Sequence, residues 1–417
     1  MKPVADDQPV TDRSSESVKS ADQKRSESML AYYRSTLLNA GEIPLVDAAA
    51  WQSHLRKRVN LYENHLGIPL GLLRGRSVLE FGCSSGENAL VLAACGAKLT
   101  LIEPNTIVIP RMKQLFRQFG LESQIVRLCH DQIQECAIDE LFDLVLAEGF
   151  LFTLAKRDEM LGKLCGWVRP GGIGVVSFND RIGMFLECTK RLALRRACQL
   201  AGIDDVGGEA SLGLAQDLFG NAFGKLNASR SLRTWWKDNL VSPFITMPYL
   251  WSFPELLPLI EQAGCEFYAS SPGFSSVDDF SWYKNVPTVV NRHLRLLEHV
   301  RNSFVYFLMG APQRYAVPAA QEVMDSVLSL QQAITVLTTC PTPRIDTIHF
   351  PAPLREYLAA HPDPEVKAFG TDLGRFFESM RLDSLPALLR ACAEIPSMQT
   401  LWGASYFYVA FKKPLRL

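Results

Sequence analysis

The chain has 417 residues, of which 47% are hydrophobic, so it can bury a large core and hold more than one structural unit. Its formal net charge of −1 argues against the basic surface of a general nucleic-acid-binding protein. Neither a signal peptide nor a transmembrane helix is expected, because the first 27 residues are polar and charged and the sequence has no uncharged apolar run of about 18 residues.

The ten cysteines are scattered through the sequence without a Cys-x-x-Cys pair, and several fall in apolar runs where buried free thiols are expected. This usage is typical of a reducing compartment, so we expect a cytoplasmic protein. We predict no metal site, because the pairs His54/His65 and His293/His299 lack the spacing of three or four residues that brings two rings to one helix face.

The first 75 residues are predicted to precede the main sheet. Residues 1–28 are rich in Ser, Asp, Lys and Glu, which predicts a disordered tail. Residues 29–75 are assigned to N-terminal helices, with helical signals over 29–39 and 47–66. In the second helix, apolar residues up to Tyr62 recur at helical spacing, which predicts first of all a packed face.

The stretch Ser77–Asn88 is the feature around which the rest of the sequence is organised. The run Val78–Phe81 predicts a buried strand, which stops at Gly82, and a helix starts near Gly86. A strand, a glycine turn and a helix in this order open a nucleotide-binding βαβ unit, and the glycines let backbone amides approach a ligand closely.

Two other kinds of site share parts of this pattern. A dinucleotide site requires G-x-G-x-x-G, but the middle position here is Ser84, and the carboxylates of Glu80 and Glu87 would repel a pyrophosphate. Residues Gly82–Gly86 also spell G-x-S-x-G, the nucleophile elbow of α/β-hydrolases, with Ser84 as nucleophile. That elbow belongs in mid-sheet, and no convincing strand precedes Ser77. Both alternatives are therefore disfavoured.

The segment Val78–Gly86 resembles the first motif of class I S-adenosylmethionine-dependent methyltransferases, written E/D-x-G-x-G-x-G. The resemblance implies S-adenosyl-L-methionine as the cofactor, with a site that includes Glu80, Gly82, Ser84 and Gly86. This ligand carries an ammonium and a sulfonium rather than phosphates, so an acidic residue at the end of the strand suits its charge. The departure from the motif is Ser84, which replaces the central glycine.

The next two predicted strands continue the resemblance. Lys98–Glu103 is a strand that ends in an acid about 20 residues past the turn, where a carboxylate can accept hydrogen bonds from both ribose hydroxyls. Gln124–Leu128 is the third strand, and the family places adenine contacts directly after it. The resemblance therefore assigns Asp131 to the exocyclic amine and Gln132 to the same end of the cofactor.

The segment Phe142–Gly149 resembles the fourth motif, a buried strand that ends near the transferred methyl group. Glu148 closes this strand where the substrate approaches, and it is the predicted catalytic residue. In the family a helix before the first motif often covers the methionine end, which makes Tyr62 a candidate. The predicted cofactor-binding residues are thus Tyr62, Glu80, Gly82, Ser84, Gly86, Glu103, Asp131, Gln132 and Glu148.

A helix over 158–168, a Pro-Gly-Gly turn over 168–172 and a strand over 173–178 complete five strands that alternate with helices. This alternation predicts an α/β fold with a doubly wound, mostly parallel sheet. The family implies seven strands with an antiparallel last strand, and the mainly helical insertions come in addition.

The domain organisation follows from this pattern. Residues 76–180 are the cofactor-binding half, 181–250 a lid insertion that begins with a basic amphipathic helix, 251–285 the return to the sheet, 286–400 a helical insertion and 401–417 the last strand. Asp180, two residues past the fifth strand, is a second acid that could face the cleft, but a solvated loop Asp is the favoured interpretation. We expect the helical insertion and the aromatic loop Asp278–Tyr283 to enclose the methyl acceptor, although a solvated or partner-binding helical surface is also compatible with the mixed charges.

The expected function is O- or N-methylation of a small-molecule or saccharide acceptor. Methyl transfer from a sulfonium is an in-line displacement that needs positioning and, for some acceptors, a proton acceptor. Nucleic acid is disfavoured because Ala147-Glu148-Gly149-Phe150 stands where the N/D-P-P-Y/F motif would be. A protein methyltransferase and a cofactor- or partner-binding module without catalysis are the alternatives. The acceptor, the methylated atom, the use of a general base and the oligomeric state stay open.

Overall fold

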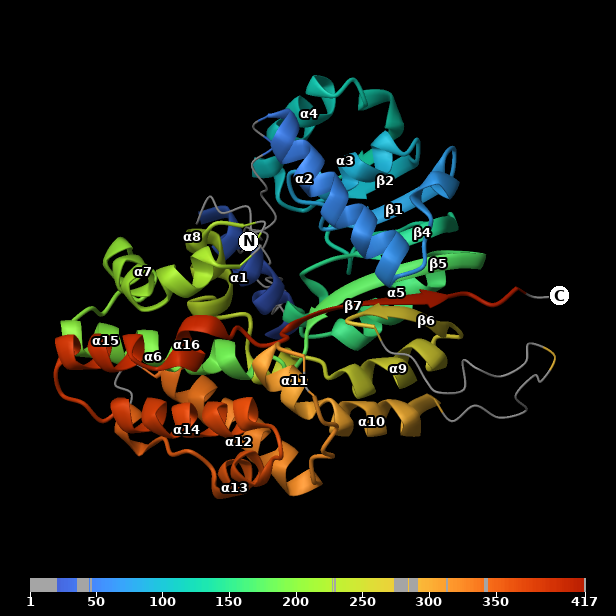
Figure 1. Ribbon diagram of the computed structural model, residues 1–417. Helices are drawn as coiled ribbons and strands as arrows, with labels where there is room; N and C mark the ends of the chain where they lie inside the picture. Colours follow the sequence, from blue (N-terminus) through green and yellow to red (C-terminus); the bar gives the residue numbers. More distant parts are fainter. Residues whose placement is uncertain are drawn as a thin grey trace, which may run out of the picture.

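Seven strands form one sheet in the order β3-β2-β1-β4-β5-β7-β6 in the computed structural model of the protein (Figure 1). The strands are β1 (Ser77–Phe81), β2 (Lys98–Ile102), β3 (Ile125–Cys129), β4 (Phe142–Ala147), β5 (Val168–Asn179), β6 (Glu266–Ser271) and β7 (Tyr406–Lys412). The pairings from β3 through β5 are parallel, whereas β7 runs antiparallel to both β5 and β6. The predicted fold class is confirmed, including the antiparallel last strand.

The structure describes residues 21–35, 45, 47–226, 228, 230–273, 284, 292–312, 314–340 and 344–415. The aromatic loop Asp278–Tyr283 and residues 1–20 of the predicted tail lie outside these ranges.

Alternating side chains in the central strands build two hydrophobic layers. Val78 and Leu144 point to one face, where they pack with α2 (Ala48–Val59), α3 (Glu87–Ala94) and α4 (Ile109–Gln118). Leu79 and Val145, their neighbours in sequence, point to the other face and pack with α5 (Arg157–Trp167) and α9 (Phe253–Gln262). The strands are buried on both faces, as parallel strands covered by helices usually are.

The N-terminal helix α1 (Ala21–Ser35) begins within the segment predicted as a disordered tail, and residues 36–39 of the predicted helix lie outside the described residues. The side chain of Arg25 explains the earlier start. It donates to the carbonyl of Thr153 at 3.1 Å, and its guanidinium lies 3.6 Å from the centre of the Tyr249 ring. These long-range contacts stabilise a helix whose polar composition alone indicates disorder, so the prediction for residues 21–28 was wrong.

The helix predicted over 47–66 is present in two parts. The side chain of Asp47 caps α2 by accepting from the backbone amide of Ala50 at 2.8 Å. From Asn60 to His65 the chain continues as a π-helix, η1, in which Tyr62 is fully buried. Such π-helical turns often occur at functional sites.

Strand β5 is longer than predicted, because the Pro-Gly-Gly segment forms a bulge instead of a turn before the strand. Val168 already pairs with Phe142, and pairing resumes at Ile173 opposite Leu144. Gly171 has φ +81°, a conformation that side chains with a Cβ rarely adopt.

The two insertions supply most of the remaining helices. They are α6 (Phe185–Ala201), α7 (Glu209–Gly224), α8 (Leu232–Trp235), α10 (Arg292–Asn302), α11 (Phe304–Met309), α12 (Gln321–Thr339), α13 (Ala352–Ala360), α14 (Pro364–Ser379), α15 (Leu385–Ala393) and α16 (Pro396–Thr400). Short 3-10 or π-helical segments span Leu70–Leu73, Thr106–Val108, Glu122–Gln124, Leu151–Thr153, Trp236–Leu240, Met247–Tyr249 and Ile345–Thr347.

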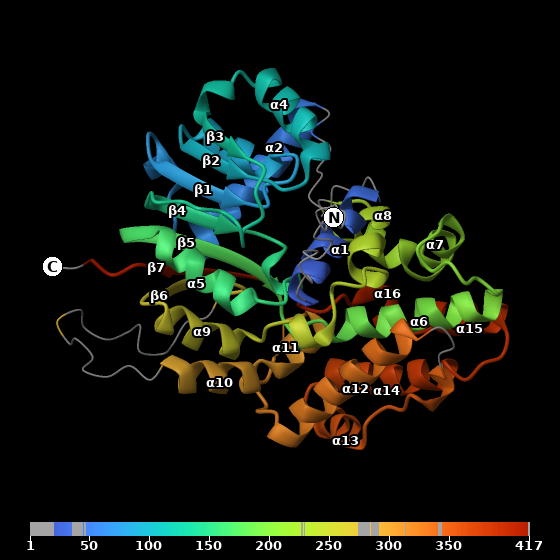
Figure 2. The same ribbon diagram turned by 180° about the vertical axis from the view of Figure 1, so that it is seen from behind.

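The helices from α10 to α16, called the helical block below, come between β6 and β7 in the sequence. They pack mainly against the other insertion: α12 and α15 contact α6, and α16 contacts α7, while α10 contacts α9 (Figure 2). The predicted basic amphipathic helix corresponds to α6, and these contacts bury several of its basic side chains. Lys190 is fully buried, with its ammonium 4.4 Å from the centre of the Trp402 ring, and Arg191 is also buried.

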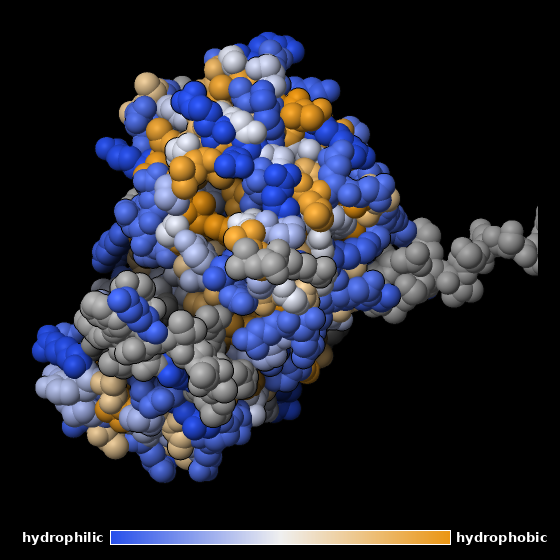
Figure 3. Space-filling view, turned by 90° about the vertical axis from the view of Figure 1, so that its right-hand side faces the viewer, coloured by the Kyte–Doolittle hydropathy of each residue, from blue (hydrophilic) through white to orange (hydrophobic). Residues whose placement is uncertain are grey.

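Within the described residues, none of the helices combines the length and apolar character needed to cross a bilayer. On the face shown in Figure 3, hydrophobic residues lie interspersed with hydrophilic ones. Scattered apolar side chains of this kind are ordinary on protein surfaces.

We predict that Phe407 on β7 is the most sensitive link between the sheet and the helical block. Its buried ring stacks on Phe307 of α11 with centres 5.3 Å apart, and it also contacts Phe178 and Phe253. Phe407→Ala should lower the free energy of unfolding by about 3–5 kcal/mol, as measured by chemical denaturation. The control Tyr315→Ala, at a site that is 51% exposed, should change it little. Equal effects of the two substitutions would contradict this role of Phe407.

Candidate functional site

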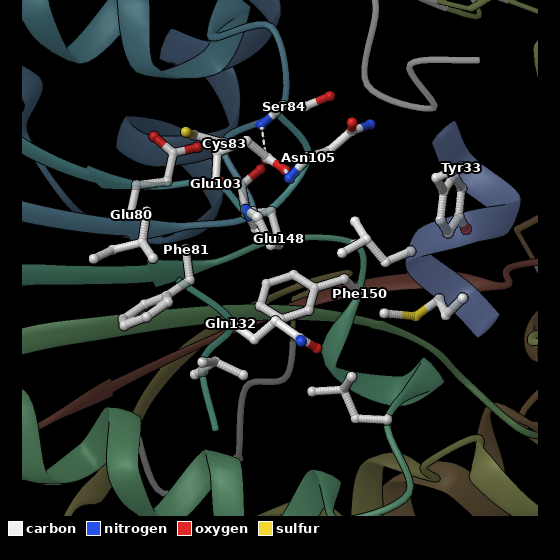
Figure 4. A pocket seen from close by; sticks show the side chains of 18 of the residues that line it. Tyr33, Glu80, Phe81, Cys83, Ser84, Glu103, Asn105, Gln132, Glu148 and Phe150 are labelled. Atoms are coloured by element: carbon white, nitrogen blue, oxygen red, sulfur yellow. Dashed lines mark hydrogen bonds between the residues drawn. The ribbon is translucent and has the colours of Figure 1, made fainter. Parts of the chain in front are cut away.

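A cavity of about 230 Å³ lies at the carboxyl ends of β1, β2 and β4. This is where the strand order reverses, which is the usual ligand position in open α/β sheets. Residues from α1, from the loops after β1 to β4, from segment 230–238 and from β7 line it, and Figure 4 shows several of them. Seven of the predicted site residues are among the lining residues: Glu80, Gly82, Ser84, Glu103, Asp131, Gln132 and Glu148.

The glycine turn has a left-handed backbone at each motif position. Gly82 has φ +65°, Ser84 +54° and Gly86 +85°, and Ser84 is the one non-glycine residue with positive φ in the described part of the chain. The side chain of Glu103 accepts a hydrogen bond from the backbone amide of Ser84 at 2.7 Å. This bond stabilises the strained conformation and so accounts for the tolerance of serine where the motif has glycine.

Gly86 does not line the cavity, in contrast to its predicted role in cofactor binding. A Cβ atom at this position would lie 2.8 Å from the side chain of Met112 and 3.2 Å from Phe116 on α4. The lack of a side chain therefore allows α3 to start close against α4. A Cβ on Gly82, by contrast, would meet the ring of Phe150, which itself lines the cavity, at 2.8 Å.

Glu80 combines burial with an unsatisfied oxygen. It is 2% exposed, and its Oε2 has no hydrogen-bond partner among the described residues. Burial, with a further contribution from Glu148, raises the pKa of Glu80 to about 8, and Arg58 opposes this rise. A buried carboxylate oxygen without a partner is costly, so a cationic group in the cavity would stabilise it.

Glu103 is the second buried acid of the cavity, and burial raises its pKa. Its Oε2 accepts from Ser84, and its Oε1 accepts from the backbone amide of Asn105 at 2.8 Å. A carboxylate can accept about four hydrogen bonds, so this side chain has capacity for a ligand that donates two.

Glu148 is held by several donors at the edge of the cavity. Both terminal nitrogens of Arg58 donate to its carboxylate, one of them at 2.9 Å, and each side chain of this ion pair is 7% exposed. Tyr62 donates at 3.2 Å, and Tyr408 and Asn88 donate at 3.3 Å each. Tyr62 was predicted to contact the cofactor, but it does not line the cavity and instead orients Glu148.

Sequence reasoning missed Arg58 and Tyr408. Arg58, near the end of α2, lies four residues before Tyr62 of η1 in one continuous helical segment. This spacing brings two side chains together and was the signal available in the sequence. Tyr408 comes from β7, far away in the sequence, and no local pattern marks it.

Of the other predicted residues, two lie at the rim of the cavity and one lies outside it. Asp131 is exposed and Gln132 half-buried at the rim of the cavity. Asp180 is buried outside it and accepts backbone amide hydrogen bonds from Ile182, Gly183 and Phe253, so it stabilises the start of the insertion. No described residue of the helical block lines the cavity, contrary to the expected enclosure of the acceptor. The described residues also contain no group of three or more His, Cys, Asp or Glu side chains placed to hold a metal ion.

We predict that Glu148 depends on its buried partner. Arg58→Met should leave an uncompensated buried carboxylate and lower the free energy of unfolding by about 3–5 kcal/mol. The double substitution Arg58→Met with Glu148→Gln should recover much of this loss, because no buried charge remains. Urea denaturation measures both, and Arg117→Met, which breaks an exposed ion pair with Glu122, is the control that should change little. A double variant as unstable as the single one would contradict the explanation.

Residues 78–172 match the protein family described as methyltransferase domain. Probable protein arginine N-methyltransferase 6 of Arabidopsis thaliana is 25% identical over 122 residues, which are 28% of this chain and 28% of that protein. The tRNA U34 carboxymethyltransferase of Hydrogenovibrio crunogenus is 26% identical over 130 residues, 30% of this chain and 39% of that protein.

Among solved structures, the N-methyltransferase NodS from Bradyrhizobium japonicum, in complex with S-adenosyl-l-homocysteine, is similar with 20% identity and a TM-score of 0.28. The similarity covers 36% of this chain and 74% of that chain. The matches span well under half the length of these two relatives, whose names give acceptors of different chemical class, protein arginine and tRNA. The family match runs from β1 into the bulge of β5 and leaves both insertions outside.

Proposed function

We propose that this chain, which carries a class I S-adenosylmethionine-dependent methyltransferase domain, is an enzyme that transfers the methyl group to a small-molecule or saccharide acceptor by O- or N-methylation. The observation that carries the proposal is the unsatisfied oxygen of Glu80 in a cavity shared with Glu103. When bound there, S-adenosylmethionine supplies a methyl group activated on a sulfonium.

The residues of the cavity fit the parts of this cofactor. Glu80 offers a buried acceptor to the methionine ammonium, and the charge of the ammonium offsets the unfavourable burial of the carboxylate. Glu103 has capacity to accept from the two ribose hydroxyls. Asp131 and Gln132 at the rim are assigned to adenine, with the apolar side chain of Ile133 beside them.

Glu148 acts in this proposal as a positioning group. The ion pair with Arg58 fixes its carboxylate at the end of β4, where the cofactor and the acceptor meet. Met29 and Leu30 of α1 line the same cavity and help to exclude water from it. A displacement reaction depends above all on such fixed geometry.

A protein acceptor is the second candidate, and the relatives described as protein arginine N-methyltransferases favour it. The ion pair between Glu148 and Arg58 argues against a protein arginine acceptor. An acceptor guanidinium could bind the Glu148 carboxylate only if this ion pair were broken. The wall that α1 forms on the cavity also favours a small acceptor.

The direct test is transfer of tritiated methyl groups from S-adenosylmethionine into a cell extract, followed by separation into small molecules, protein and RNA. We expect label among the small molecules.

Glu103→Ala should weaken binding of S-adenosylhomocysteine by about tenfold to a hundredfold, equivalent to about 1.5–3 kcal/mol of lost charge-assisted hydrogen bonds, as measured by calorimetry. A 2′-deoxyribose analogue should lose part of this affinity in the unmodified protein. Cofactor binding without any methyl transfer would instead support a non-catalytic module.

We further predict that cofactor affinity depends on pH through Glu80. In the unliganded protein its raised pKa of about 8 keeps this side chain protonated at lower pH, whereas a cationic ligand prefers the ionised form. Affinity for S-adenosylhomocysteine should therefore rise by about tenfold or more from pH 6 to pH 8. Glu80→Gln should remove this rise in affinity. Protonation changes of the ligand itself affect the unmodified protein and the variant equally, so the difference between them reports on Glu80.

The same shift has the opposite effect on stability. A carboxyl whose pKa is higher in the folded state stabilises the protonated protein, and this contribution is lost progressively as the pH rises from the ordinary pKa of 4.5 to the raised pKa of about 8. The unliganded protein should therefore lose stability from pH 5 to pH 9 relative to Glu80→Gln. If affinity and stability depend on pH in the same way in the unmodified protein and in Glu80→Gln, Glu80 has no role in the cofactor site.

A further inference from the structure

The cavity has a second wall, away from the glycine turn, which the family match does not cover. Helix α1, segment 230–238 and strand β7 build this wall. Figure 4 shows Tyr33 of α1 on the opposite side of the cavity from Glu80. Three segments far apart in the sequence thus place polar side chains opposite the proposed cofactor site.

Asp238 is the centre of this wall. Its Oδ1 accepts a hydrogen bond from the hydroxyl of Tyr33 at 2.9 Å, and its Oδ2 accepts from Arg230 at 2.9 Å. The side chain of Asp238 is 15% exposed and lines the cavity. Within the described part of the chain these two side chains are its donors, and a carboxylate can accept about four hydrogen bonds. Asp238 is thus oriented by its neighbours and has capacity for a ligand.

Tyr406 connects this wall with the end of β4. Its hydroxyl lies 2.6 Å from Oγ of Ser177, which accepts from the backbone amide of Gly149 at 2.8 Å. Tyr406 is 38% exposed, and the charges of Arg230, Glu148 and Asp238 all act on its phenol. The phenol therefore lies within electrostatic reach of both Glu148 and Asp238, and the Asp238 wall adjoins the place where the methyl group is delivered.

The charges of the cavity restrict what this wall can bind. Six carboxylate residues and one arginine line the cavity: Glu80, Glu87, Glu103, Asp131, Glu148, Asp238 and Arg230. The arginine is already paired with Asp238. Glu148 and Glu87 are paired with Arg58 and Arg111, which do not line the cavity, but Glu103 and Asp131 have no such ion pair among the described residues. An acceptor that carries a phosphate or carboxylate would therefore face like charge, whereas hydroxyl and amine groups find acceptors. Met29, Leu30 and Leu154 offer an apolar surface in the same cavity.

We propose that Asp238, held by Tyr33 and Arg230, anchors the methyl acceptor, and that this acceptor is an uncharged or cationic small molecule that donates a hydrogen bond to Asp238 from a hydroxyl or amine group. The inference rests on the proposed function of the same cavity and adds the acceptor class and a residue that determines specificity. Glu80 and Glu103 bind the cofactor, and Asp238 selects the molecule that receives the methyl group.

The test compares Asp238→Asn, which keeps the size of the side chain, with the matched control Asp217→Asn at an exposed position on α7. For each protein, calorimetry gives the affinity for S-adenosylhomocysteine. The rate of label transfer from tritiated S-adenosylmethionine is then measured with the protein-free, low-molecular-weight fraction of a cell extract. Ion exchange sorts the labelled products by charge after the unreacted donor has been removed.

We expect Asp238→Asn to bind S-adenosylhomocysteine within about twofold of the unmodified protein and to transfer label at least about tenfold more slowly, while Asp217→Asn matches the unmodified protein in both. Tyr33→Phe removes one donor to Asp238 and should raise KM for the acceptor more than it lowers kcat. This second variant keeps the inference testable if Asp238→Asn does not fold. The labelled product should not be an anion.

Three results would overturn the inference and leave cofactor binding intact: label in anionic products, label only in protein or RNA, or undiminished transfer by Asp238→Asn. A loss of cofactor affinity in Asp238→Asn that equals its loss of transfer would also overturn it, because the residue would then act on the cofactor site. Failure of the unmodified protein to bind S-adenosylhomocysteine would instead overturn the proposed function itself.

Discussion

The buried ion pair between Arg58 and Glu148 joins the parts of the chain on which the cavity depends. It links α2 to the end of β4, and Tyr408 brings the last strand into the same network. A buried pair of charges is tolerated only when its desolvation is offset by good geometry and by further hydrogen bonds. Both guanidinium nitrogens at the tip of Arg58 donate to the carboxylate, and Tyr62, Tyr408 and Asn88 supply additional donors. The edge of the sheet at the cavity is consequently fixed in one arrangement.

The carboxylates of Glu148 and Glu80 lie near each other but have opposite environments. Glu148 is saturated by donors, whereas one oxygen of Glu80 has no partner in the described part of the chain, and burial raises the pKa of Glu80 to about 8. Nearby carboxyl groups with such different surroundings usually serve different roles. Here the satisfied group fixes geometry, and the unsatisfied one is suited to meet a cation. The positive φ of Ser84, held by Glu103, adds a strained backbone to the same site.

Local pattern was sufficient to predict the elements that follow each other closely in the sequence. The strand ending at Phe81, the glycine turn, and the acid at position 103 are all encoded within about one βαβ unit, so periodicity and spacing identify them. The family resemblance also implied the antiparallel last strand, which is β7. The early start of α1 escaped prediction, because its contacts with Thr153 and Tyr249 span more than a hundred residues.

The acceptor wall escaped prediction for the same reason. Tyr33 and Asp238 are 205 residues apart, and nothing in either local sequence indicates that they meet. For the helical block, enclosure of the acceptor was one of the alternatives, and no described residue of the block lines the cavity. Sequence order shows where an insertion leaves and returns, but the face on which it packs depends on contacts with the other insertion.

The helical block nevertheless has a physical connection to the acceptor wall. It covers α6, on which Arg191 is buried and donates to the backbone carbonyls of Asn239 at 2.6 Å and Ile245 at 3.0 Å. Glu187 of the same helix accepts from the indole of Trp235, three residues before Asp238. The segment that carries Asp238 is therefore tied to α6, and α6 is buried because α12 and α15 pack on it. The described residues of the block do not line the cavity, but through helix packing and buried hydrogen bonds they support the wall that does. The block therefore has a structural role in the site.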